Sequence, residues 1–333
     1  MGFHLAPSQY NGGKTQMGIL NNLNGFINAL PGATAEGLIW GIMAIGLFIT
    51  YKLLELSDLT VDGSFCTGGA VCAAMLTAGH SVWIAMLVAM LAGMAAGYIT
   101  GFLHTRCKIP AILASILTQL GLWTVNLVVM DMHSTMAILA GNNDVLVAMV
   151  FLEEVTMGLK PFYYYPILTI GLFTAVIIGI LYWFFGTERG ASIRATGANV
   201  NMARAQGINT DFNKVLGLMI ANGLVALSGA LLAQYKGSAE INMGRGAIVI
   251  GLAAIIIGEV TFGKLFKNFA LRLLAVSLGA IIYYIVIQVV ISLIDVDAQY
   301  MKLFSAVVVA VFLTVPNLQQ GKGRKKVKEV QNA

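Results

Sequence analysis

Few residues in this chain could carry out covalent or acid–base chemistry, and none of them falls into a catalytic pattern. The run Gly12-Gly13-Lys14-Thr15 resembles the end of a phosphate-binding loop, but Ser8 stands where that loop needs its first glycine. Neither His-Glu-x-x-His nor Gly-x-Ser-x-Gly occurs, and the histidines and cysteines are scattered. We therefore expect no catalytic residue, no metal site and no nucleotide bound by this chain itself.

The residue types that do form a pattern lie between Arg194 and Asn209. This stretch is basic and rich in alanine and glycine, and it separates two long apolar runs. Small residues let another backbone approach closely, and the guanidinium groups of Arg194 and Arg204 suit acidic groups on a partner. The pattern is typical of a short helix that docks onto a soluble protein. It favours a transporter subunit driven by another protein over an enzyme.

Composition places most of the chain in contact with lipid. Hydrophobic residues make up 58% of the chain and charged residues 11%, and the mean hydropathy is +0.82. A soluble domain carries roughly 25% charged residues, so this chain must be embedded in a membrane. The net charge of +5 does not indicate nucleic-acid binding, because the basic residues gather in loops and in the cluster 321–328. Anionic membrane lipid is the simplest partner for that cluster.

Apolar runs of about 20 residues, the length needed to cross a bilayer, predict an all-α polytopic membrane protein. We expect about nine transmembrane helices, within a range of eight to ten, at 33–54, 64–79, 81–103, 109–130, 165–186, 212–235, 246–261, 268–293 and 298–315. The second run is short and contains Gly68 and Gly69, with Gly63 directly before it, so we predict a discontinuous helix there. Membranes tolerate broken helices only where the backbone is packed in protein or lines a cavity, which places this run near a transport path.

These runs divide the chain into three regions. An N-terminal extension covers 1–32, a transmembrane domain with a cytosolic loop at 187–211 covers 33–316, and a basic tail covers 317–333. The extension could hold an interfacial helix or a tenth span at 17–30. With the C-terminus in the cytosol, alternating spans put fifteen of the twenty lysines and arginines on the cytosolic side, as the positive-inside rule requires.

Polar groups inside the predicted spans are mostly neutral. Thr118, Gln119 and Asn126 spread over more than two turns of one helix, so they could line a polar stripe or hold helices together. Asp62 precedes the second span, where its carboxylate suits either an N-cap or a substrate contact. A close helix–helix contact is predicted by three glycines that repeat every four residues, Gly93, Gly97 and Gly101.

Three motifs carry a resemblance to a known family. They are Leu59-Thr60-Val61-Asp62-Gly63-Ser64-Phe65, then Arg194-Ala195-Thr196-Gly197 with Asn199, Ala203, Gly207 and Ile208, and finally Ile257-Gly258-Glu259 followed by Gly263-Lys264. Over residues 34–316 the chain resembles the permeases of ABC importers for branched-chain amino acids, ribose and nucleosides. Within that family it is most similar to the branch for tryptophan or tyrosine uptake.

The resemblance implies a dimer of this chain in a bacterial cell membrane. Two cytosolic ATPases would hold ATP and Mg²⁺, and an extracytoplasmic solute-binding protein would deliver the substrate. The residues implied in ATPase coupling are Arg194, Ala195, Gly197, Asn199, Ala203, Arg204, Gly207, Ile208 and Glu259. The substrate path is expected at the dimer axis, near the second and fourth spans, lined by Asp62, Ser64, Phe65, Thr118, Gln119 and Asn126.

The expected function is the membrane subunit of an ATP-driven importer for a small solute, with an aromatic amino acid favoured. An ion-coupled secondary transporter is the alternative, which the neutral spans and the basic loop disfavour. A structural or sensory membrane protein, or an intramembrane enzyme, is disfavoured by the lack of catalytic groups. A neutral polar lining suits a nucleoside or a sugar as well as an amino acid, so the amino-acid assignment rests on the resemblance alone.

Overall fold

The computed structural model describes residues 12–138, 165–263, 265–266 and 268–294, together with positions 306, 307, 309, 310 and 314. Side chains are described from residue 29 onward, except those of 165 and 292–294. The helices of this part are α1 (Gly12–Phe48), the π-helical turn η1 (Ile49–Leu53), α2 (Thr60–Thr77), α3 (Val82–Thr105), α4 (Ala111–Val129), α5 (Tyr165–Gly186), α6 (Glu188–Ala198), α7 (Val200–Ala205), α8 (Thr210–Lys236), α9 (Ala247–Phe262) and α10 (Phe269–Ile294). Two short strands, β1 (Thr135–Ala137) and β2 (Ser238–Glu240), pair antiparallel.

The helices agree with the predicted class of polytopic membrane protein. Within the described residues, six helical segments are long and apolar enough to cross a membrane: Ala29–Leu53, Val82–Thr105, Ala111–Val129, Pro166–Gly186, Thr210–Lys236 and Phe269–Ile291. The second and seventh predicted runs correspond to α2 and to the shorter α9. The ninth run, 298–315, lies mostly outside the described residues, so the total of nine spans stays a prediction.

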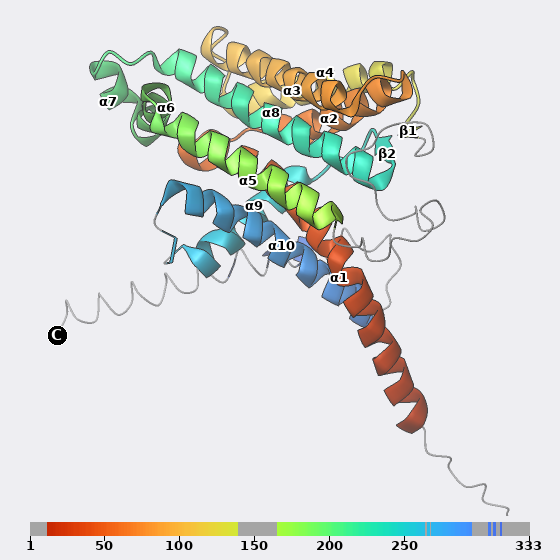
Figure 1. Ribbon diagram of the computed structural model, residues 1–333. Coiled ribbons are helices and arrows are strands. Elements are labelled where there is room, and N and C mark those ends of the chain that lie inside the picture. The colour runs from red at the N-terminus through yellow and green to blue at the C-terminus, as the bar shows by residue number, and fades with distance from the viewer. Residues whose placement is uncertain are drawn as a thin grey trace, which may run out of the picture.

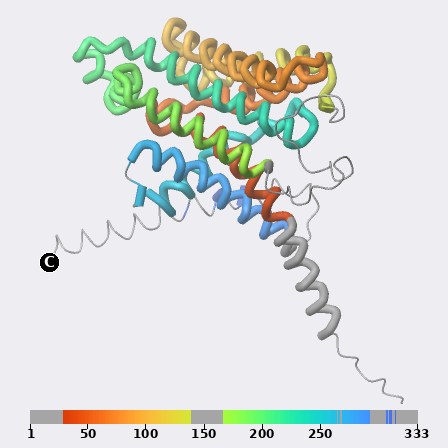
Figure 2. The backbone as a smooth tube through the Cα atoms, in the orientation of Figure 1, coloured from red at the N-terminus to blue at the C-terminus, as the bar shows by residue number. Residues whose placement is uncertain are grey.

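The core of the bundle surrounds α8. This helix packs against α3, α2 and α1, and the views in Figures 1 and 2 show it running between α3 and α5. In the most apolar stretches of α1 and α8, 78% of the residues are buried, whereas in α4 and α5 only 22% are. The exposed faces of α4 and α5 carry large apolar side chains, as expected of helices that contact lipid or another membrane protein.

The prediction that the second span is discontinuous is wrong, because α2 is one continuous helix from Thr60 to Thr77. Its glycines serve close packing instead. A Cβ atom at Gly68 would collide with the carbonyl group of Ala226 in α8, and one at Gly229 would collide with the carbonyl group of Phe65 in α2. Helices associate in membranes through such small residues. Irregular backbone does occur nearby, but it precedes α2, in η1 and in the connection 54–59.

The predicted boundary at residue 32 falls inside α1, which continues through Pro31 to Phe48. The role of residues 1–32 therefore stays a prediction. At the far end of α1, Lys52 forms an ion pair with Glu259 at the end of α9, with Nζ and Oε1 3.0 Å apart. At the other end of the bundle, Lys236 pairs with Glu36 at 3.3 Å, close to the β1–β2 pair.

Candidate functional site

The start of α2 is joined to the start of α9 by the carboxylate of Asp62. Its Oδ2 atom accepts a hydrogen bond from the backbone amide of Gly246, and Oδ1 accepts one from that of Ile248, both at 3.0 Å. These amides belong to the first turn of α9, where free N–H groups and the helix dipole favour a negative charge. Asp62 thus caps α9, whereas the sequence predicted an N-cap for its own helix or a substrate contact.

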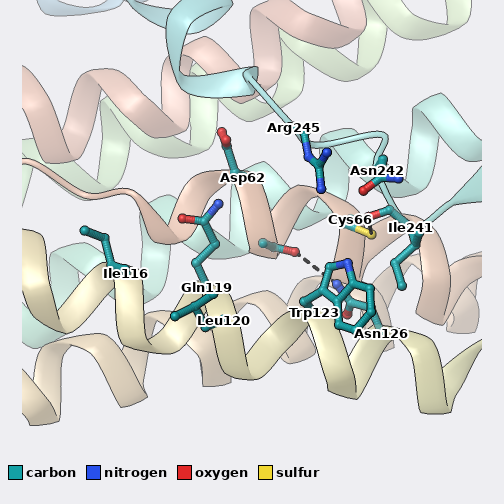
Figure 3. Close-up of a pocket in the computed structure, with 11 residues that line it drawn as sticks. Asp62, Cys66, Ile116, Gln119, Leu120, Trp123, Asn126, Ile241, Asn242 and Arg245 are labelled. Carbon is teal, nitrogen blue, oxygen red and sulfur yellow. Dashed lines mark hydrogen bonds between the residues drawn. The ribbon is translucent and has the colours of Figure 1, made fainter.

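A recess of about 210 Å³ opens beside Asp62, between α2, α4 and the segment that links β2 to α9. Its lining combines carboxylate, guanidinium and amide groups with apolar side chains. Figure 3 shows these residues: Asp62, Gly63 and Cys66 from α2; Ile116, Gln119, Leu120, Trp123 and Asn126 from α4; and Ile241, Asn242 and Arg245 from the link.

The amide of Asn126 is the least satisfied polar group in this recess. Its Nδ2 atom donates to the carbonyl oxygen of Gly63 at 3.4 Å, a long hydrogen bond. The Oδ1 atom is buried and accepts no hydrogen bond from any described residue. The thiol of Cys66 lies in the same recess, but it donates its hydrogen to the carbonyl oxygen of Ile241, at 3.2 Å.

Arg245 supplies the positive charge of the recess. It is exposed, and among the described residues it forms no ion pair. In the view of Figure 3 its guanidinium group points from the link toward Trp123, while the amide of Gln119 points toward Asp62. Within the described part of the chain, the recess therefore combines an unpaired cation, a carboxylate already bonded to α9, and amides that can both donate and accept.

The residues predicted to line the substrate path divide into two groups. Asp62, Gln119 and Asn126 line the recess. The other three face the core: Ser64 donates to Asn222 of α8 at 2.7 Å, Phe65 stacks on Trp40 of α1, and Thr118 accepts from Thr100 of α3 at 2.9 Å.

Two lining residues, Trp123 and Arg245, were not singled out from the sequence. Trp123 lies four residues after Gln119 and three before Asn126, so helical spacing could have placed it on the same face. Arg245 comes from a link far away in the sequence, and no pattern in the chain connects it to α4.

A second polar cluster lies just before the recess, and its central member, Asp58, was not predicted to have a role. Asp58 is only 2% exposed. Its Oδ1 atom accepts from the backbone amide of Thr60 at 2.9 Å, and Oδ2 accepts from Nδ2 of Asn222 at 2.7 Å. Asp58 therefore accepts a hydrogen bond from the first turn of α2, the N-capping role that was one of the two predictions for Asp62. Through Asn222 it also joins the start of α2 to α8.

The predicted coupling helix is divided into two short helices, α6 and α7, by the extended backbone of Asn199. The side chain of Asn199 caps α7 by accepting from the amide of Met202 at 3.0 Å. Arg194, Ala195, Asn199 and Gly207 are exposed and Ile208 is half-buried. The exposed Met202, at 64%, adds an apolar group to this surface that the sequence analysis did not single out.

Three of the predicted coupling residues are engaged within the chain instead of being free for a partner. Gly197 is buried where a Cβ atom would collide with the carbonyl group of Leu53 in η1, and Ala203 is buried as well. Arg204 pairs with Asp211 at 3.1 Å and donates to Thr210 at 2.8 Å. The remaining predicted coupling residue, Glu259, has both carboxylate oxygens within 3.1 Å of Nζ of Lys52, and its side chain is 41% exposed.

The glycines Gly93, Gly97 and Gly101 of α3 all face α8. Added Cβ atoms would meet the backbone of Asn222, Leu218 and Val215, respectively. Such an arrangement brings the two helix backbones together at three successive turns.

A bundle of apolar helices long enough to cross a membrane, with a polar recess between two of them, defines a multi-pass membrane protein. The chain belongs to the family described as the branched-chain amino acid transport system permease component, whose model matches residues 32–315. Members of this family are transport subunits of ABC-type systems and not themselves enzymes, and they work with an ATPase and a solute-binding protein.

Individual relatives agree with this assignment. The chain is 36% identical over 283 residues to a tyrosine transport system permease protein of Clostridioides difficile, covering 85% of this chain and 90% of the relative. It is 32% identical over 290 residues to an uncharacterised protein of Rickettsia prowazekii, covering 86% and 98%. It is 28% identical over 224 residues to an autoinducer 2 import system permease protein of Salmonella paratyphi B, covering 66% and 60%. No solved structure matches.

Proposed function

We propose that this chain is the transmembrane subunit of an ATP-driven importer for an amino acid, with an aromatic one favoured. The similarity to a tyrosine transport permease over most of both chains carries the proposal. The recess between α2, α4 and the β2–α9 link supports it, because it offers polar groups and an indole ring to a small solute at a place where α4 is not covered by the rest of the chain.

The partners follow from the same proposal. A second copy of the chain forms the other half of the path, two separate ATPases hold ATP and Mg²⁺, and an extracytoplasmic solute-binding protein delivers the amino acid. The ATPases contact the exposed residues of α6 and α7, among them Arg194, Ala195 and Met202. The C-terminus lies in the cytosol, because that orientation gives the basic loops the side that the positive-inside rule assigns to them.

Contacts within the chain offer a route from the ATPase surface to the recess. Gly197 of α6 lies directly against Leu53 of η1. The backbone then runs through the connection 54–59 into α2, where Asp62 holds the first turn of α9. A displacement of α6 would therefore shift η1, the start of α2 and one wall of the recess together, since packed elements move as units rather than deforming.

The first test is purification of the full chain from its native membrane in mild detergent, with mass spectrometry of what accompanies it. A stoichiometric ATPase and uptake that requires ATP are expected. The variant Ala195→Trp should lower the recovered ATPase at least about tenfold, because a bulky exposed group would separate the two surfaces. The matched control is Ser81→Trp, which is also exposed but lies at the opposite end of the bundle.

Two other outcomes would contradict the proposal. If no ATPase accompanies the chain and uptake stops when the ion gradient is collapsed, the protein is an ion-coupled secondary transporter instead. If the two tryptophan variants retain the same amount of ATPase, the α6–α7 surface is not the coupling surface.

A further inference from the structure

The recess beside α2 contains groups whose bonding is incomplete within the described part of the chain, and their chemistry defines a ligand. We propose that the recess binds the α-carboxylate and α-ammonium groups of an amino acid: Arg245 pairs with the carboxylate, and the Oδ1 atom of Asn126 accepts from the ammonium group. The proposal rests on the transport function proposed above, and it assigns specificity residues to that function.

The strongest indication is the unpaired acceptor of Asn126. The residue is 1% exposed, and its Oδ1 atom accepts no hydrogen bond from the described part of the chain. Leaving a buried acceptor unpaired costs about 1–3 kcal/mol, so native proteins leave few of them. Asn126 lines the recess, so a ligand that enters it and displaces the side chains over the amide supplies the missing donor. An ammonium group, with three N–H donors, meets that need.

The charges of the recess favour a ligand that also carries a carboxylate. The carboxylate of Asp62 is stabilised by the amides and dipole of α9, and both of its oxygens accept hydrogen bonds there, so it is already engaged within the chain. Arg245 lies in the same recess and forms no ion pair among the described residues. A guanidinium group matches the two oxygens of a carboxylate in a bidentate pair, which is stronger than a neutral hydrogen bond.

The size and walls of the recess fit the remainder of an amino acid. A volume of about 210 Å³ is below the roughly 300–1,000 Å³ of sites that hold drug-sized molecules. Trp123 and Leu120, which are 48% and 66% exposed, form an apolar wall that can pack on a flat side chain. A sugar or a nucleoside has no anionic group, so Arg245 would lose part of its hydration in exchange for neutral acceptors only.

The experiment measures how ligands protect a cysteine placed in the recess. In the full-length chain, Cys66→Ala and Cys72→Ala remove two native thiols, Gln119→Cys puts a thiol in the recess wall, and the native Cys107 is kept. Cys107 is exposed and is not among the residues that line the recess, so its reaction with a small thiosulfonate reagent serves as an internal control. Peptide mass spectrometry follows the two thiols separately.

Four ligands test the contributions of the carboxylate and of the ammonium group separately. They are L-tyrosine, tyramine, which lacks the carboxylate, 3-(4-hydroxyphenyl)propionate, which lacks the ammonium group, and uridine, which has neither. We expect L-tyrosine to protect the introduced thiol at position 119 at a concentration at least about tenfold lower than each of the other three, since a charge-assisted pair is worth about that much. In Arg245→Gln the advantage of L-tyrosine over tyramine should disappear, and in Arg245→Lys it should return in part.

The carboxylate assignment is overturned if tyramine or uridine protects as well as L-tyrosine, or if Arg245→Gln leaves that difference unchanged. The ammonium assignment is overturned if the propionate protects as well as L-tyrosine. If no ligand protects, the recess is not a substrate site. A monodisperse elution profile in detergent like that of the native chain shows that Arg245→Gln is folded, as expected for a substitution at an exposed residue.

Failure of this inference can be told apart from failure of the proposed function. A stoichiometric ATPase and ATP-dependent uptake without protection would leave the importer in place and move its substrate site elsewhere. Protection without any ATPase would leave the site in place and change the energy source.

Discussion

The two sides of α2 differ in how completely their polar groups are bonded. On the side toward α8, Ser64 donates to Oδ1 of Asn222, and Asn222 donates in turn to Asp58 and to the carbonyl oxygen of Leu218. On the side toward α4, the amide of Asn126 makes one long contact of 3.4 Å with Gly63, and its oxygen is unpaired among the described residues.

This difference separates groups that hold the helices together from groups that are available to a ligand. A buried network in which every member is bonded makes the helix arrangement unique, whereas one buried acceptor without a donor costs stability. Proteins tolerate such a cost mainly where function needs it. The same residue type, asparagine, thus has a structural role on one side of α2 and a recognition role on the other.

The largest expected effect comes from disrupting the close contact of α2 and α8. Gly68→Leu should prevent folding, or destabilise the protein by about 3 kcal/mol or more, because its side chain would collide with the backbone of Ala226. The yield of monodisperse protein in detergent and its thermal midpoint measure this. The control is Gly121→Leu in α4, where no described atom lies within 4 Å of the added Cβ. Equal yields of the two variants would contradict the packing role of this side.

A matched pair of asparagine substitutions tests the comparison itself. Asn222→Leu should destabilise the protein by about 3 kcal/mol, because it leaves Oδ2 of the buried Asp58 and the hydroxyl group of Ser64 without the partner they have now. Asn126→Leu should cost less than about 1 kcal/mol, because it removes an acceptor that is already unpaired among the described residues. Unfolding in mixed detergent micelles gives both values.

For uptake, in contrast to stability, Asn126→Leu is expected to have a large effect. In membranes with matched amounts of folded protein, Asn126→Leu should reduce amino-acid uptake at least about tenfold despite its small effect on stability. A loss of stability as large as that of Asn222→Leu would show that Asn126 is structural like its counterpart.

A smaller loss of stability than that of Asn222→Leu is expected at the boundary between the two sides, where Asp62 caps α9. Asp62→Ala should lower stability by about 1–2 kcal/mol, the usual cost of losing an N-cap, because the amides of Gly246 and Ile248 lose their acceptor. Asp62→Asn should restore part of this, since a neutral amide oxygen can still accept. If Asp62→Ala is as stable as the native chain but abolishes uptake, the carboxylate acts on the substrate and not on α9.

The helical class and most helix positions could be predicted because they depend on apolar runs whose length must match a bilayer. The glycine spacing of α3 likewise follows from helical geometry, which places every fourth residue on one face. The recess was half predicted: Asp62, Gln119 and Asn126 line it, but Ser64, Phe65 and Thr118 turn toward the core. When nearly all residues of a short buried helix are small or apolar, the spacing of its apolar residues does not reveal which face meets which neighbour.

Composition and apolar runs are enough to establish that this chain is a helical membrane protein, and its motifs and relatives place it among ABC-type permeases. Those properties depend on stretches of neighbouring residues. The packed bundle was needed to establish that α2 is continuous, that Asp58 and not Asp62 serves the start of α2, and that Arg245 shares a recess with Asn126. The bond from Asn222 to Asp58, the bonds from α9 to Asp62 and the meeting of Arg245 with Asn126 join segments more than a hundred residues apart, and spacing along the sequence does not reveal such contacts.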